Sequence, residues 1–129
     1  MAVLHSLYPS SPNVKIIKDV AKALIAGALV IYPTDTVYAL GCLSSNHKAL
    51  GRLAKLKKVK VEQAPFSFLF SDMSDLSSYV QQFDSPTFRL LKRTLPGPYT
   101  YIMLGTRKLP KPFDKRKSIG IRISDDPIL

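Results

Sequence analysis

Four polar side chains stand together between two apolar runs within Leu29–Leu43. Thr34, Asp35, Thr36 and Tyr38 supply two hydroxyls, a carboxylate and a phenol, which are groups that hold a polar ligand through hydrogen bonds. They follow a predicted strand, at the place where strands of α/β sheets give way to binding loops. Two interpretations stay open: a binding loop, or a Thr/Asp turn that satisfies its own backbone.

The second group of candidate residues is cationic. Lys55, Lys57, Lys58 and Lys60 place four lysines within six residues at the end of a predicted helix. The helix dipole favours a lysine there by only about 0.3–1 kcal/mol, which does not account for all four. A bound phosphate would relieve their mutual repulsion, and lysine suits phosphate as a mobile point charge. A solvated charged face is the alternative.

The third group lies on a predicted strand over 118–123. Its alternating pattern places Ser118, Gly120 and Arg122 on one face. An arginine within a strand lies either at a solvent edge or is aimed at an anion, and the sequence favours neither. The preceding segment, 107–117, is predicted to be a basic loop that contains proline.

Strands and helices alternate along the chain, which predicts an α/β fold. A first helix running to Ile25 is predicted to be capped by Ser11, with Pro12 as its first residue, and to pack its apolar stripe on a sheet. The remaining predicted helices are one capped within 44–46 and carrying apolar residues to Leu56, one over 76–80, and one opened by Ser85 with Phe88, Leu90, Leu91 and Leu95 inward. The predicted strands are 29–32, which should be buried, 37–43, 66–70, 99–104 and 118–123.

Composition bounds the class of protein. With 129 residues, 46% of them hydrophobic and 22% charged, the chain is expected to form one ordinary globular domain. A net charge of +10 favours a polyanionic partner. No apolar run is long enough to span a bilayer, so no membrane partner is expected. There is no metal-ligand spacing either.

The single cysteine, Cys42, excludes an internal disulfide and fits a cytoplasmic location. It is predicted to be a buried, inert thiol, because neither His5 nor His47 is an obvious base for it.

Several motifs together resemble one known family. Pro33–Gly41 (PTDTVYALG), the lysine-rich segment that follows, Pro96–Thr100 (PGPYT) and Ser118–Arg122 (SIGIR) have the order and spacing of the YrdC/YciO family. The best-known members of that family are the threonylcarbamoyl-AMP synthases of tRNA modification. The resemblance is closest to the YciO-like branch, because Ala39 stands where the synthases usually have glycine.

The resemblance implies a twisted mixed sheet flanked by helices, with a concave basic cavity. It divides the chain into an N-terminal arm, residues 1–12, and a YrdC-like domain, residues 13–129. The C-terminal part of the family fold, with its Ser-x-Asn segment, is expected to be absent. An exposed sheet edge would then favour self-association.

The resemblance also implies an activity, in which ATP, L-threonine and bicarbonate give threonylcarbamoyl-AMP and pyrophosphate. Magnesium would accompany ATP, with no dedicated ligands in the chain. Lys57 stands where the family has an arginine. The alternative is a double-stranded RNA or tRNA-binding module without catalysis. Carried over by position, the site residues are Thr34 and Arg122 for threonine, Lys55, Lys57 and Lys60 for the phosphates, and Ser118 for the nucleotide.

Overall fold

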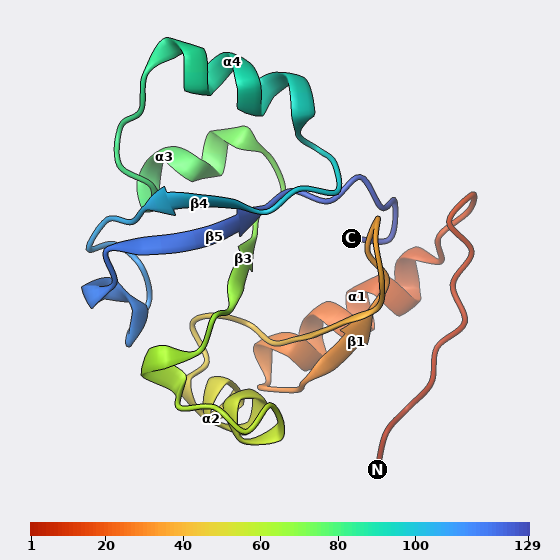
Figure 1. Ribbon diagram of the computed structural model, residues 1–129. Coiled ribbons are helices and arrows are strands. Elements are labelled where there is room, and N and C mark those ends of the chain that lie inside the picture. The colour runs from red at the N-terminus through yellow and green to blue at the C-terminus, as the bar shows by residue number, and fades with distance from the viewer.

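The computed structural model describes all 129 residues, and its elements follow the predicted order (Figure 1). Residues 1–13 contain no helix or strand. The helices are α1 (Val14–Ile25), α2 (His47–Leu56), α3 (Leu76–Tyr79) and α4 (Ser85–Thr94), and short 3₁₀ turns cover Val61–Gln63, Met73–Asp75 and Phe113–Lys115. The strands are β1 (Val30–Tyr32), β2 (Ala39–Gly41), β3 (Ser67–Leu69), β4 (Tyr101–Leu104) and β5 (Ser118–Arg122).

The strands form two separate sheets. β1 and β2 pair antiparallel as a hairpin, with Val30 opposite Gly41. The other sheet has the order β3-β5-β4, in which β3 runs parallel and β4 antiparallel to the central β5. The prediction of an α/β fold with a mixed sheet is therefore confirmed. The strands that flank the polar residues of Thr34–Tyr38, however, form a hairpin that is separate from this mixed sheet.

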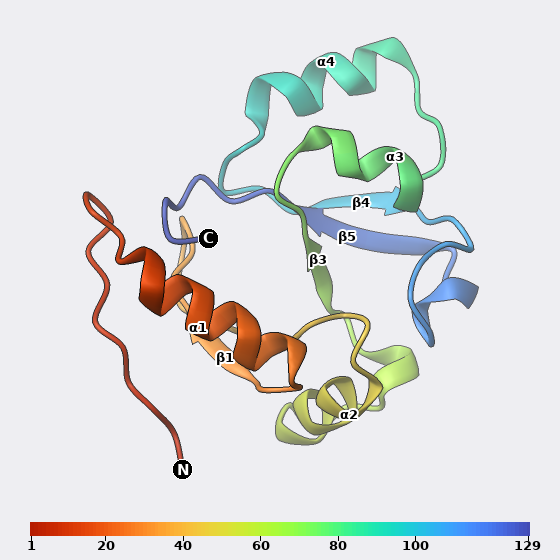
Figure 2. The same cartoon turned by 180° about the vertical axis from the view of Figure 1, so that it is seen from behind.

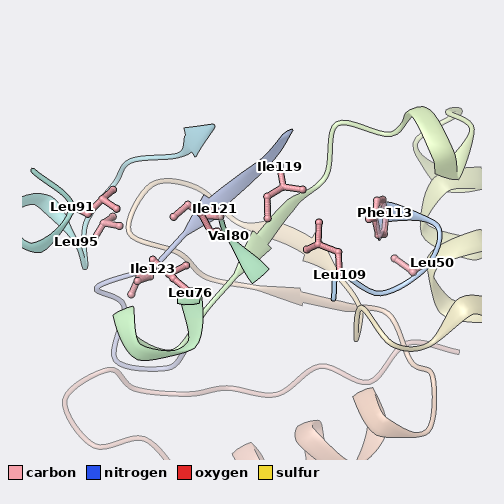
Figure 3. Close-up of a cluster of buried hydrophobic side chains, with 10 residues drawn as sticks. All are labelled: Leu50, Leu76, Val80, Leu91, Leu95, Leu109, Phe113, Ile119, Ile121 and Ile123. Carbon is pink, nitrogen blue, oxygen red and sulfur yellow. The ribbon is translucent and has the colours of Figure 1, made fainter. Parts of the chain in front are cut away.

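The hydrophobic core is packed against one face of the three-stranded sheet. Ile119 and Ile121 of β5 are buried on that face, and α3 and α4 lie together above β4 and β5 in both views (Figures 1 and 2). Figure 3 shows the ten core residues: Leu50, Leu76, Val80, Leu91, Leu95, Leu109, Phe113, Ile119, Ile121 and Ile123. Burial of this apolar surface is the main force that holds β5 in place.

The opposite face of β5 carries Ser118, Gly120 and Arg122, as the alternation predicts. None of the three is buried. Ile102, which pairs with Gly120 across the sheet, is 71% exposed. This open face thus presents the polar residues of β5 beside exposed apolar neighbours.

The first helix differs from its prediction at both its cap and its packing. Asn13, not Ser11, is the N-cap, because its side-chain oxygen accepts the backbone N–H groups of Lys15 and Ile16. Pro12 therefore precedes the helix. No residue of α1 is buried, so its apolar stripe does not pack tightly on a sheet.

The predicted strands around the polar loop were too long and too buried. Ile31 is 70% exposed, because β1 pairs only with β2 and alternate side chains of a two-stranded ribbon point away from the rest of the molecule. The second strand covers only Ala39–Gly41, so that Val37 and Tyr38 belong to the loop.

The inward face of α4 is narrower than predicted. Leu91 and Leu95 are buried, but Phe88 and Leu90 are 46% and 41% exposed. Leu91 and Leu95 are four residues apart and so lie on the same side of the helix. Only this side packs against the core. The prediction for Phe88 and Leu90 was wrong.

Candidate substrate-binding site

The loop that joins β1 to β2 lies beside the C-terminal end of the chain (Figures 1 and 2). Within it the Thr34 hydroxyl donates to the carbonyl oxygen of Val37 at 2.6 Å and accepts the backbone N–H of Thr36 at 3.1 Å. These contacts are those of a threonine turn that satisfies its own backbone. Thr34 therefore makes the turn contacts that the local interpretation predicted.

Asp35, in contrast, reaches out of the loop. Its Oδ1 lies 3.3 Å from Nη2 of Arg122, and its Oδ2 accepts the backbone N–H of Asp125 at 3.1 Å. The side chains of Arg122 and Asp35 are 23% and 13% exposed, so the ion pair is largely shielded from water. The arginine on β5 is therefore aimed at an anion, which is a carboxylate of its own chain.

A chain of hydrogen bonds connects Arg122 to Thr34. Nη2 of Arg122 also donates to Oγ1 of Thr36 at 3.3 Å, and the two threonine hydroxyls lie 3.0 Å apart. Because the single proton of Thr34 goes to Val37, the Thr36 hydroxyl must be the donor between them. Proton donation thus runs in one direction from the guanidinium into the loop, an arrangement in which successive bonds polarise one another.

Some N–H donors of the Arg122 guanidinium have no partner in the protein. Both of its side-chain contacts use Nη2, and Nε and Nη1 have no hydrogen-bond partner in the protein. An arginine presents five N–H donors in a planar fork that matches a carboxylate. Arg122 is therefore held on one side and free to bind an anion on the other.

Tyr32 lies near Arg122, and Cys42 lies near Tyr32. Burial raises the pKa of the Tyr32 phenol, and the positive charge of Arg122 opposes that rise. The Tyr32 ring rests against Gly41, where a Cβ atom would come within 2.8 Å of it. Cys42 is half-buried rather than buried, and burial raises its thiol pKa, which makes it a poor nucleophile.

Ser118 lies at the opposite end of β5 from Arg122. They are four positions apart along the strand, which is about 13 Å. Ser118 lines a cavity of about 350 Å³ together with Arg116, Lys117 and residues of β3 and β4. Arg116 is already engaged, because it donates to the carbonyl oxygen of Ala64 and lies over the Phe113 ring. Lys117 is the cation of this cavity whose side chain makes no hydrogen bond or ion pair within the protein.

The lysine cluster lies around the end of α2. Lys55 is in the last turn of the helix, Lys57 is the cap, and Lys58 adopts a left-handed backbone (φ 56) that reverses the chain. Together with Lys60 all are exposed and none forms an ion pair. Figure 1 shows α2 at the other end of the hairpin from its loop. No hydrogen bond or ion pair joins this cluster to Arg122.

No group of three or more His, Cys, Asp or Glu side chains is arranged to hold a metal ion. No helix combines the length and apolar composition needed to cross a membrane.

Comparison with known proteins places these features in context. The family model for Sua5, YciO and YrdC proteins, described as "Telomere recombination", matches residues 22–129, which is most of the chain. The chain belongs to the Sua5/YciO/YrdC family. The resemblance deduced from the sequence motifs is thereby confirmed.

Three members of the family illustrate its range. The uncharacterised protein YciO of Escherichia coli K12 is 33% identical over 130 residues, covering 99% of this chain and 62% of YciO. Its crystal structure superposes with a TM-score of 0.83 over 95% of this chain and 59% of that one, at 34% identity. A threonylcarbamoyl-AMP synthase of Coxiella burnetii is 29% identical, covering 87% of this chain and 60% of the synthase.

The third is P. abyssi Sua5, whose crystal structure was determined in complex with L-threonine. It has a TM-score of 0.81 at 23% identity, covering 92% of this chain and 35% of that one, and so supports the fold. This chain spans about 62% of the length of the YciO relative.

The structure places Asp35, Thr36 and Asp125 around Arg122. The sequence singled out Asp35 and Thr36 only as polar groups of the loop, without a link to Arg122, and it assigned no role to Asp125. The only sequence signal was an acidic residue between two threonines, with no local partner. The six predicted site residues do not converge on one point. Arg122 and Thr34 are linked through Thr36, whereas Ser118 and the lysines lie elsewhere.

Proposed function

We propose that this family member binds L-threonine and ATP and takes part in threonylcarbamoyl-AMP synthesis. The observation that carries the proposal is Arg122, which is held at Nη2 by Asp35 and Thr36 while Nε and Nη1 remain unpartnered. A preoriented guanidinium with free donors suits the carboxylate of an amino acid. The threonine complex of Sua5 and the name of the Coxiella burnetii relative support the choice of amino acid and reaction.

In the proposed reaction, the amine of threonine and bicarbonate give a carbamate with loss of water. A carbamate oxygen then attacks the α-phosphorus of ATP as the bond to pyrophosphate breaks. The protein supplies position and charge rather than a nucleophile. Arg122 and the loop of Thr34 would hold threonine, Lys55, Lys57 and Lys60 the phosphates, and Ser118, beside Lys117, the nucleotide. Magnesium would arrive with ATP, and the reaction would take place in the cytoplasm.

The first test is thermal unfolding of the 129-residue chain alone, with L-threonine, with Mg-ATP and with both. A ligand that binds only the native state stabilises it by about 2.7 kcal/mol at one hundred times its Kd. We expect both ligands to raise the melting temperature, and Arg122→Ala to abolish the threonine effect while keeping that of Mg-ATP.

The matched control is Lys15→Ala, which removes an exposed cation from α1. It should retain both ligand effects. Protection by threonine that persists unchanged in Arg122→Ala would refute the assignment. Threonine-dependent release of pyrophosphate is the following measurement.

A second candidate function is binding of double-stranded RNA or tRNA. It is favoured by the cationic surface, because Arg122 is the only one of the 19 lysine and arginine side chains in an ion pair. Phosphate contacts release counterions, so log K should fall with log salt by about 0.9 per contact. We expect Lys57→Ala to remove about one phosphate contact and so to reduce the steepness of that salt dependence by about 0.9. Binding that is insensitive to salt would exclude this function.

A further inference from the structure

Asp35 is the residue through which the hairpin and the three-stranded sheet are joined. One of its carboxylate oxygens contacts Arg122 at the end of β5, and the other accepts the backbone N–H of Asp125, just beyond β5. Together with the bond from Arg122 to Thr36, these are the only hydrogen bonds between the hairpin, residues 30–41, and the rest of the chain. Two of these three hydrogen bonds are made by the Asp35 side chain.

The contact is specific rather than a random surface pairing. The chain has 19 basic and 9 acidic side chains, yet only Asp35 and Arg122 form an ion pair. Exposed ion pairs contribute little to stability, but this pair is mostly shielded from water. Fixing a long arginine side chain costs conformational entropy. Because Asp35 already holds the Arg122 side chain in the free protein, less conformational entropy is lost when a ligand binds to it.

We infer that Asp35 is a positioning residue for the threonine site. It holds Nη2 of Arg122, so that Nε and Nη1 are presented to the ligand carboxylate, and it anchors the 123–126 segment beside them through Asp125. The inference rests on the proposed function, because it takes the ligand to be L-threonine. The opposite possibility is that the Asp35 carboxylate occupies the place of the ligand and competes with it.

These two possibilities give opposite results for Asp35→Asn. The amide keeps the shape of the side chain, but it loses the charge and one of the two acceptor oxygens. A positioning role predicts that threonine affinity falls about tenfold or more, as expected for a lost hydrogen bond to a charged group. Asp35→Glu, which keeps the carboxylate, should restore part of the affinity. Tighter threonine binding by Asp35→Asn would show competition and overturn the inference.

The matched control is Asp19→Asn, which makes the same change on the exposed side of α1 and should leave threonine affinity unchanged. Calorimetric titration with L-threonine gives the affinities, and the melting temperature of each variant shows that it is folded.

The second readout is independent of the ligand. In ¹⁵N NMR spectra we expect the Nη groups of Arg122 to show hindered rotation in the wild type and to lose it in Asp35→Asn. Wild-type protein that does not bind threonine, but shows this NMR change, would refute the proposed function and leave the positioning of Arg122 intact. Wild-type protein that binds threonine, with both readouts unchanged in Asp35→Asn, would refute the inference alone.

Discussion

Phe113 and Phe68 meet edge to face, with ring centroids 5.2 Å apart and ring planes at 90°. Phe113 comes from the basic segment 107–117, and only 1% of its surface is exposed. Leu109 of the same segment is also buried. The segment that carries six cationic residues is therefore anchored in the core, which fixes Arg116 and Lys117 beside the cavity at Ser118.

The anchoring role of Phe113 can be measured through stability. Phe113→Ala should lower the free energy of unfolding by about 3–5 kcal/mol, because it removes a buried ring and leaves a cavity. Phe88→Ala is the control, since that ring is 46% exposed on α4, and it should cost much less. Urea unfolding of the two variants is the measurement, and equal losses would contradict the assignment of Phe113 to the core.

Gly120 has close side-chain neighbours on the open face of the sheet. A Cβ atom there would lie 3.0 Å from Oγ of Ser67 and 3.3 Å from Cγ2 of Thr100. We expect Gly120→Ala to destabilise the protein by about 1 kcal/mol or more, as overpacking does. Gly51→Ala in α2 meets no atom within 4 Å and should stabilise the protein by about 0.5–1 kcal/mol. Urea unfolding compares the two, and the same sign for both would refute this account.

Cys42 should make the stability depend on alkaline pH. Burial raises the pKa of its thiol above the ordinary value of 9.0, so the folded state favours the neutral form. The resulting stabilisation is complete below the unfolded pKa and is lost as the pH rises through the folded pKa. Melting temperatures should therefore fall less steeply above about pH 9 in Cys42→Ala than in the wild type. Parallel pH profiles would show that the thiol does not contribute.

Much of the secondary structure could be predicted because its signals are local. The Asn46 cap of α2, the alternation of β5 and the pattern of α4 each depend on residues within a few positions, so the sequence alone locates these elements. The face of β5 that carries Arg122 follows from the period of a strand. The family motifs likewise lie within short segments of the chain.

Burial and pairing between distant segments were decided only by the tertiary structure. Ile31 and Phe88 look like core residues by type but are exposed, while Phe113 is buried although it lies in a basic loop. Asp35 and Arg122 stand 87 positions apart. No local pattern predicts their contact, because it depends on how the hairpin docks against the end of β5. The sequence therefore determined which groups could bind a carboxylate and phosphates. Docking determined that the guanidinium is held by Asp35 and Thr36, with two nitrogens left free for a ligand.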